Sequence, residues 1–303
     1  MVPRQGRKGY NGTESLLESH KESPLSAMEQ TPDFAKPPIV EFVLGAQFAP
    51  LENFTTGHFG LFWERLGREE WPIAGEEPPL DPKFELFDAP RWRMARNLQF
   101  KLQPGFQPGR FTLQNAERDR MIQLQDTRLL LNWRKRTSGD EVKYPSYKVL
   151  IGEFEKRFAF LEAFVAEHKL GELQLNQWEI TYVDSFPQDE LWQSPADWQR
   201  ILPGLFGTLS TTTQSELSLE HRAAEWSYEI KPKKGRLHVN AQVGYLTESA
   251  RPSLLLNLTA RGPIGGQGVA SLREGLDLGH LVSVREFLAM VDPKIKTMWN
   301  QKQ

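Results

Sequence analysis

The sequence contains no cysteine. Disulfide bridges, thiolate metal sites and cysteine nucleophiles are therefore excluded. It also lacks an apolar run near the ~20 residues that a membrane-spanning helix needs. No apolar segment follows the basic residues Arg4, Arg7 and Lys8 near the N-terminus, so a secretory signal is not expected. We therefore expect a cytoplasmic protein with no membrane partner.

An excess of one sign of charge is missing as well. The 37 Lys and Arg residues are balanced by 39 Asp and Glu residues, which gives a net charge of −2. Such a chain has no overall field that attracts nucleic acid, so phosphate binding would need a local cluster of basic side chains.

The motifs of common catalytic and metal sites are also absent. None of the six histidines belongs to an HExxH pattern or has another histidine three or four positions away. The sequence has no GxSxG elbow, SxxK pair or kinase signature. The glycine-rich run at residues 262–268 lacks the lysine and hydroxyl of a phosphate loop, and we interpret it as a flexible connection. We expect no catalytic residues, no metal and no cofactor, and we favour a protein that is not an enzyme.

What the sequence does contain is an internal repeat. EFVLGAQF at residues 41–48 corresponds to EITYVDSF at 179–186, with Glu and Phe framing both segments. Three further pairs follow in the same order and at a nearly constant offset: Gly109-Arg110 with Gly235-Arg236, Leu129 to Asn132 with Leu254 to Asn257, and Phe160-Leu161 with Phe287-Leu288. Two tandem units, at residues 39–171 and 172–303, are the simplest interpretation.

Residues 1–38 precede the first unit and are polar and rich in proline. We expect them to form a disordered tail. Met28 lies ten residues before the first ordered pattern, and we expect it to be the natural start of the protein.

Both units show the same predicted order of elements. The first has a strand at 39–48, a helix at 56–66, an irregular loop at 71–91, four strands at 97–102, 110–114, 122–125 and 129–136, and a helix at 147–168. The second has a strand at 175–186, a helix that begins at Ser194-Pro195, strands near 215–221, 224–231, 235–246 and 252–261, and a helix from about 281 to 299 that is kinked at Pro293.

These patterns predict an α+β protein built from two tandem strand–helix–antiparallel sheet–helix repeats. The helices would cover one face of the sheet and leave the other face polar or covered by a partner. A pseudo-twofold axis would relate the units, and the element order resembles that of TATA-binding-protein-like saddles. A fold analogy of this kind does not confer function.

The polar faces of the strands are the best surface candidate. Amide and guanidinium groups of this kind recognise phosphates and bases, although an ordinary solvated sheet face has the same composition. We favour a solvated or partner-covered face, partly because the aromatic residues that stack on single strands lie mostly on the apolar side. The candidate binding residues are Lys101, Arg110, Asn132, Arg134 and Arg136 in the first unit, and Arg236, His238, Asn240, Asn257 and Arg261 in the second.

Three other residues are candidates for a polar interface or site. Glu41 and Glu179 occupy equivalent positions in the two first strands, between apolar neighbours. If buried they need partners, and an ion pair or a backbone cap is favoured over a pair of catalytic acids. His280 follows Asp277 and Gly279 near the last helix, where a structural or capping role is favoured over a ligand contact.

Several short motifs, taken in order, carry a resemblance to a known family. They are PPIVEFVLGAQF at residues 37–48, RLLLNWRK at 128–135 followed by YPSY at 144–147, and DLGH at 277–280. The chain resembles a sporadically distributed family of uncharacterised prokaryotic proteins. The resemblance implies no defined activity. The patchy distribution of the family would fit an accessory system such as phage defence or toxin neutralisation.

Together these features predict a binding or regulatory protein that uses the polar sheet face or the groove between the units. The expected partner is a protein or a polar ligand, and a homodimer is a further option. The alternative is a nucleic-acid-associated protein that acts through the Arg-rich face of the first unit.

Overall fold

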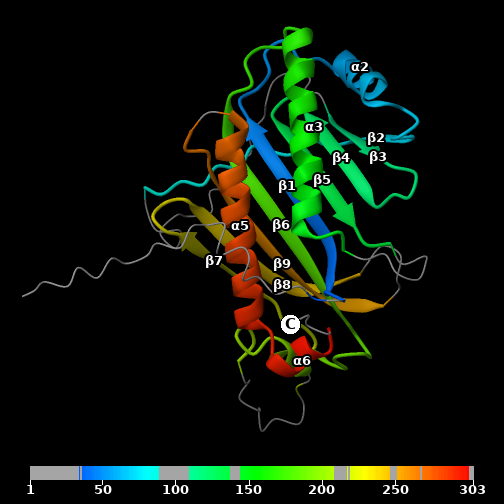
Figure 1. The fold of residues 1–303 in the computed structure, drawn as a ribbon. Helices are drawn as coiled ribbons and strands as arrows, with labels where there is room; N and C mark the ends of the chain where they lie inside the picture. The colour runs from blue at the N-terminus through cyan, green and yellow to red at the C-terminus, as the bar shows by residue number, and fades with distance from the viewer. Residues whose placement is uncertain are drawn as a thin grey trace, which may run out of the picture.

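The computed structural model describes residues 34, 36–88, 109–136, 144–207, 217, 219–245, 251–266 and 268–299. Its centre is a sheet in which nine strands of this part of the chain follow the order β2-β3-β4-β5-β1-β6-β9-β8-β7 (Figure 1). Each neighbouring pair of these strands is antiparallel. The predicted α+β class with an antiparallel sheet is confirmed.

The strands of the first half lie on one side of the sheet and those of the second half on the other. The first five are β1 (Ile39–Phe48), β2 (Ile73–Glu77), β3 (Arg110–Gln114), β4 (Arg120–Gln125) and β5 (Arg128–Arg134). The remaining four are β6 (Leu175–Pro187), β7 (Ala224–Ile230), β8 (Gly235–Tyr245) and β9 (Pro252–Pro263). β1 and β6 pair with each other at the centre, so the sheet is continuous across both halves.

Alternation along the strands separates an apolar face from a polar one. On β1, Phe42 and Leu44 are buried on one face, and Glu41 points to the other. On β5, Leu129, Leu131 and Trp133 alternate with residues of the polar face. Because side chains of a strand point to opposite faces in turn, this pattern fixes which face the helices cover.

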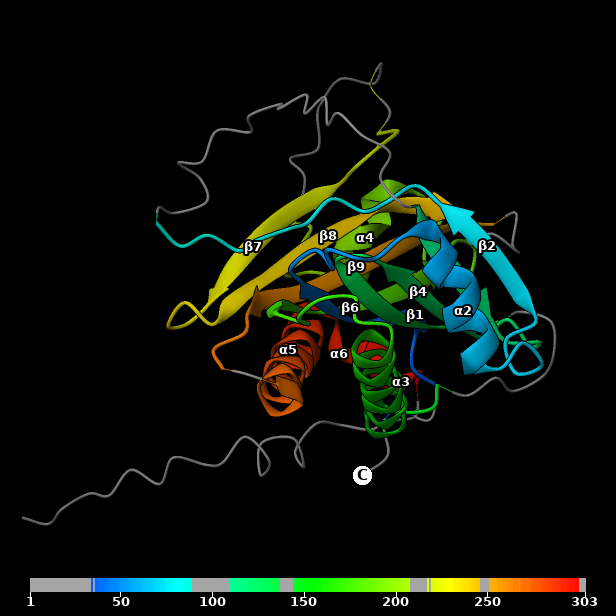
Figure 2. The ribbon, with the colours of Figure 1, turned by 90° about the horizontal axis from the view of Figure 1, so that it is seen from above.

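The long helices α3 (Tyr147–Glu167) and α5 (Gly268–Met290) pack side by side on the apolar face (Figures 1 and 2). The shorter helix α2 (Thr56–Leu66) covers the outer strands on the same face, because its Phe59 ring stacks on Phe111 of β3 at 5.1 Å between centroids. Phe62 of α2 also meets Phe164 of α3 at 5.3 Å. Helices and sheet thus enclose one continuous apolar core.

The last long helix begins earlier than predicted. The sequence pattern placed its start near residue 281, whereas α5 begins at Gly268. Gly275 and Gly279 in the early part of this helix each face the sheet: a Cβ at Gly275 would overlap the ring of Trp178, and one at Gly279 would lie 2.5 Å from Ile180. The two glycines therefore let the helix backbone approach β6 closely.

Other predicted elements also differ from the observed ones. The loop predicted at 71–91 contains the edge strand β2. The helix after Ser194 is only a short 3₁₀ turn, Pro195–Asp197, followed by α4 (Trp198–Ile201). Pro293 does not kink a continuous helix but begins a separate one, α6 (Pro293–Thr297), at the position where proline is tolerated.

Two predicted strands have no counterpart in the described chain. The strand at 97–102, which includes Lys101, lies outside the described residues. Of the strand predicted near 215–221, the described residues 217 and 219–221 have no strand structure.

The beginning of the described chain is tied to its end. The Phe34 ring meets Trp299 edge-on at 5.8 Å, and the Lys36 amide donates to the Trp299 carbonyl at 3.3 Å. Within the described part of the chain, no helix is both long and apolar enough to cross a membrane.

Candidate functional site

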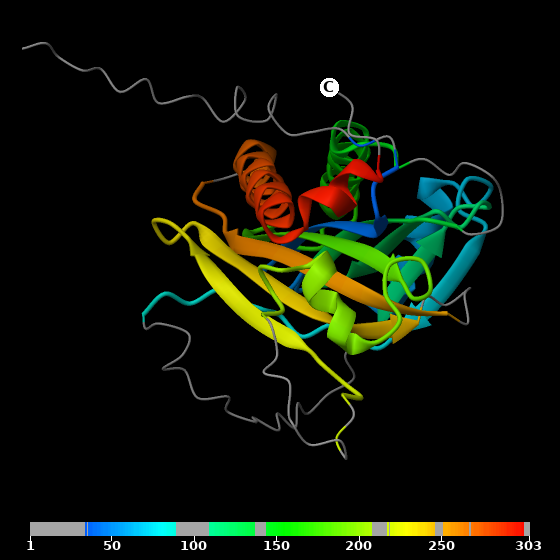
Figure 3. The same cartoon turned by 90° about the horizontal axis from the view of Figure 1, so that it is seen from below.

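Within the described residues, one segment crosses the polar face of the sheet. It comprises residues 78–88, follows β2 and is called the strap below. Figures 2 and 3 show it as a cyan trace on the face opposite α3 and α5. Between residues 80 and 86 it contacts β4, β5, β1, β6, β9 and β8 in the order in which they lie in the sheet. Six strands at a spacing of ~4.8 Å span about 24 Å, so a stretch this short must be almost fully extended.

Three glutamines, one from each of three strands, bind the main chain of the strap. The side-chain oxygen of Gln125 on β4 accepts from the Leu80 amide at 3.0 Å, and its nitrogen donates to the Leu80 carbonyl at 3.0 Å. Gln47 on β1 accepts from the Lys83 amide at 2.9 Å. Gln177 on β6 accepts from the Glu85 amide at 3.4 Å. The sheet therefore recognises backbone groups of the strap, which every residue type except proline supplies in full.

Two arginines add contacts to strap carbonyls. Arg128 on β5 donates to the Asp81 carbonyl at 3.2 Å, and Arg236 on β8 donates to the Leu86 carbonyl at 2.6 Å. The Arg236 guanidinium also lies 4.6 Å from the ring centroid of Phe87, within the range of a cation–π contact.

The one side chain that the strap buries is the carboxylate of Glu85. It accepts hydrogen bonds from Arg236 at 2.8 Å, from His238 at 2.7 Å and from Arg261 at 3.1 Å. Burial by itself raises the pKa of Glu85, but these hydrogen bonds and the neighbouring charges outweigh it and lower the pKa to about 2. Glu85 is therefore ionised at neutral pH. Arg236, His238 and Arg261 are called the carboxylate seat below.

The rest of the strap stays near the surface. Phe84 and Leu86 flank Glu85 and are 52% and 56% exposed, whereas Glu85 is 9% exposed. Strap attachment therefore depends mainly on polar contacts and buries little apolar surface.

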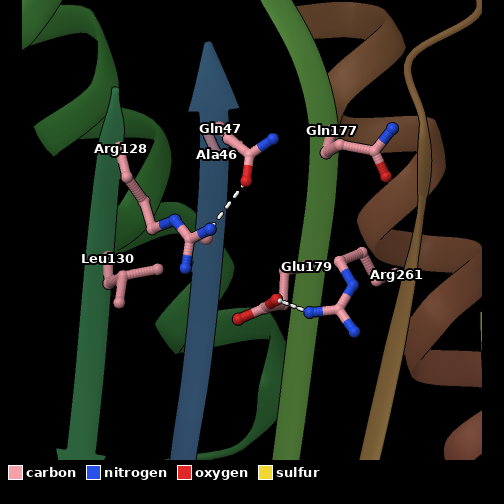
Figure 4. Close-up of a pocket in the computed structure, with 8 residues that line it drawn as sticks. Ala46, Gln47, Arg128, Leu130, Gln177, Glu179 and Arg261 are labelled. Carbon is pink, nitrogen blue, oxygen red and sulfur yellow. Dashed lines mark hydrogen bonds and ion pairs between the residues drawn. The ribbon is translucent and has the colours of Figure 1, made fainter. Parts of the chain in front are cut away.

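A small hollow lies at the centre of the polar face (Figure 4). Its walls include Gln47 and Arg128 on one side and Glu179 and Arg261 on the other. Gly45 also lines the hollow, and a Cβ at this position would lie 2.6 Å from Leu130. Burial lowers the pKa of Arg128, and the nearby charge of Glu179 acts in the opposite direction.

The two symmetric acids of the sequence pattern form ion pairs with adjacent strands. Glu41 on β1 accepts from Arg134 on β5 at 3.2 Å, and Glu179 on β6 accepts from Arg261 on β9 at 2.7 Å. In both cases the two residues face each other directly across the strands. Glu41 also accepts from Asn132 at 2.9 Å. The acids do not form a pair with each other.

The remaining candidates divide between the strap site and its surroundings. Arg110 donates to Gln123, which in turn donates to Asn132 at 2.7 Å. Asn240 and Asn257 face each other across β8 and β9, and Arg136 lies beyond the end of β5. Only Arg236, His238 and Arg261 of the predicted binding residues touch the strap through the contacts described.

His280 lies on the other face of the sheet. Its ring stacks on Tyr147 of α3 at 4.0 Å, and its Nδ1 atom is 2.6 Å from the Tyr182 hydroxyl. The Tyr147 hydroxyl donates to Asp277 at 2.7 Å, so the YPSY and DLGH segments meet here. Burial lowers the pKa of His280 to about 4, which keeps the ring neutral at pH 7. Because His280 lies on the opposite face of the sheet from Glu41, Glu179 and His238, it does not share a cleft with them.

Asp184 is a second buried acid, also on the helix-covered face. It is 4% exposed and lies opposite Ile39 of β1 and Leu256 of β9. Burial raises its pKa to about 8, and no charged partner in the described chain offsets this. The side chain is therefore mostly protonated at neutral pH.

Several site residues were not among the sequence candidates. Glu85 was hidden in a proline-rich segment, and its signal was a single acid among the apolar residues Phe84, Leu86 and Phe87. Gln47 was a polar residue in an otherwise apolar stretch, an even number of positions after Glu41 and so on the same strand face. Gln177 offered a similar signal ahead of Glu179.

The described residues include no group of three or more His, Asp or Glu side chains placed to hold a metal ion. Comparison with family models, with curated proteins and with solved structures found no match to this chain.

Proposed function

We propose that the protein is a non-enzymatic binding protein whose polar sheet face holds an extended polypeptide segment. The observation that carries this proposal is the set of glutamines from β4, β1 and β6 that accept hydrogen bonds from the amides of Leu80, Lys83 and Glu85. Main-chain hydrogen bonds supply affinity for an extended peptide, and side-chain contacts supply specificity. Here the carboxylate seat fills the second role.

We further infer that the two halves descend from one duplicated unit, which would place this face across a pseudo-twofold axis. Two observations support this. Outward from the centre the strands run β1-β5-β4-β3 in one half and β6-β9-β8-β7 in the other. The cross-strand pair Glu41–Arg134 also has a counterpart in Glu179–Arg261. Superposing residues 39–171 on 172–299 tests the duplication, and matched elements that fail to overlay would refute it.

A nucleic-acid partner is the alternative proposal, and the charges on the face count against it. Arg134 pairs with Glu41, Arg236 pairs with Glu85, and Arg261 contacts both Glu85 and Glu179. A basic face whose guanidinium groups are already neutralised releases few counterions. A gel-shift titration at two salt concentrations tests this alternative, which requires binding that weakens steeply with salt.

Selection from a displayed peptide library tests the main proposal. The baits are the wild-type protein and the Glu85→Gln variant. The variant is included because a firmly bound strap would keep peptides from the polar face of the wild type. We expect the selection to yield peptides that bind the polar face. Their binding should be lost when Gln47 and Gln177 are both replaced by Ala. The matched control replaces Gln114 and Gln242, which lie on the same face but have no contact with the strap among the hydrogen bonds described.

Two results would overturn the proposal. One is the absence of selected peptides with either bait. The other is a set of peptides that bind the Gln47 and Gln177 double variant and the control double variant equally well. The first result together with steep, salt-dependent gel shifts would favour the nucleic-acid alternative.

A further inference from the structure

The strap contacts the sheet as a bound peptide does, and not as a core segment. Its main chain is held by side chains of the sheet, one acidic side chain is buried, and the flanking Phe84 and Leu86 remain exposed. A typical net hydrogen bond contributes only ~1 kcal/mol. Because the strap adds little apolar burial, lifting it would cost the core little.

The carboxylate seat is built so that an anion must occupy it. Arg236 and Arg261 face each other directly across β8 and β9, and their side chains are 8% and 11% exposed. Like charges that lie opposite each other on neighbouring strands repel. In the described ion pairs, Glu179 contacts Arg261 but not Arg236. In the structure Glu85 bridges both guanidinium groups and His238. A carboxylate is therefore the group that the seat selects.

We propose that the strap occupies in cis the binding site for an extended segment of a partner protein, and that a glutamate in this segment replaces Glu85 in the seat. This inference rests on the function proposed above and specifies the partner: an extended polypeptide with an acidic side chain. Tethering raises the local concentration of the strap to roughly millimolar. The strap therefore acts as a built-in competitor that weak acidic segments do not displace.

A peptide with the strap sequence, PPLDPKFELFD, is the probe for this exchange. It is labelled with fluorescein and titrated by anisotropy into the wild type, into Glu85→Gln and into Lys83→Pro. The first variant removes the strap carboxylate, and the second removes the amide that donates to Gln47. Neither variant alters the seat, and the second serves if the first fails to fold.

We expect both variants to bind the peptide roughly tenfold or more tightly than the wild type does, because the competitor is weakened. A peptide with glutamine in place of its glutamate should bind roughly tenfold or more weakly, because the seat then lacks its carboxylate. The matched control is Glu77→Gln, an exposed change just before the strap, which should behave as the wild type.

Equal binding of the peptide to the wild type and to both folded variants would overturn the inference, and so would equal binding of the glutamate and glutamine peptides. If library peptides still bind through Gln47 and Gln177 in that case, the proposed function stands and only the role of the strap is wrong. If no peptide of either kind binds, the proposed function itself fails.

Discussion

The two faces of the sheet bury carboxyl groups in opposite ways. On the polar face, Glu85 receives hydrogen bonds from Arg236, His238 and Arg261, and its pKa falls to about 2. On the helix-covered face, Asp184 is buried without a charged partner in the described chain, and its pKa rises to about 8. Burial favours the neutral form of an acid in both places. The presence or absence of cationic hydrogen-bond partners then decides whether the acid is charged.

The two faces therefore differ in the groups that they can hold. A face that supplies cations for an acid can accept another acid in its place. A face that keeps Asp184, Tyr182 and His280 neutral instead packs helices closely against strands.

Replacing Arg261 by Ala should destabilise the protein by about 3–5 kcal/mol, because a buried charge pair is broken from one side. Both Glu85 and Glu179 lose a partner. The control is Arg200→Ala, whose side chain is 78% exposed and whose pair with Asp197 should contribute ~0–1 kcal/mol. Urea unfolding measures both variants. Equal losses would show that the polar face does not depend on charge compensation.

Replacing Asp184 by Asn should remove a pH dependence of the free energy of unfolding. The native state keeps a proton on Asp184 that the unfolded chain releases above the ordinary pKa of 3.8, so the wild type should lose stability as pH rises towards about 8. From pH 5 to pH 8 we expect the Asp184→Asn variant to lose roughly 1–3 kcal/mol less than the wild type. Parallel pH profiles for the two proteins would contradict an uncharged Asp184.

Acid should release the strap through Glu85. The pKa of Glu85 is lowered from 4.5 to about 2. Its contribution to the stability of the bound strap is therefore complete above pH 4.5 and is lost as the pH falls through 2. Between pH 5 and pH 2.5, exchange of the Lys83 and Glu85 amides, corrected for intrinsic rates, should rise roughly tenfold or more. In Glu85→Gln the same amides should exchange quickly at both pH values, and slow exchange there would contradict the role of the carboxylate.

The smallest effect concerns a single main-chain contact. Gln177→Ala removes the acceptor for the Glu85 amide and should lower the free energy of unfolding by about 1 kcal/mol. Gln242→Ala changes an exposed glutamine of the same face and should stay within about 0.5 kcal/mol of the wild type. Chemical unfolding of the two variants side by side tests whether the strap glutamines differ from ordinary surface amides.

Much of the fold could be predicted from local patterns. The bounds of β1 and α2 match the predicted residues 39–48 and 56–66, because alternation and helical spacing are strong there. β2 was missed because prolines at 72, 78 and 79 surround a short edge strand. The start of α5 was missed because Gly275 and Gly279 serve close packing on Trp178 and Ile180, which only the fold brings near.

The polar face was predicted, but its occupant was not. Alternation placed Arg236, His238 and Arg261 on one face, as the strand register shows. Their partner Glu85 lies 151 positions before Arg236 along the chain. No local pattern encodes a contact at that separation, and a proline-rich segment is typical of a loop whether or not it lies on a sheet.

The central pairing of β1 with β6 has a consequence for any attempt to divide the chain. These two strands pair along most of their length, from Ile39 opposite Asp184 to Phe48 opposite Leu175. A fragment cut after residue 171 would expose one full edge of β1, with open amide and carbonyl groups beside apolar side chains, and such an edge invites aggregation. The halves should therefore melt together in a single cooperative transition, whatever their ancestry.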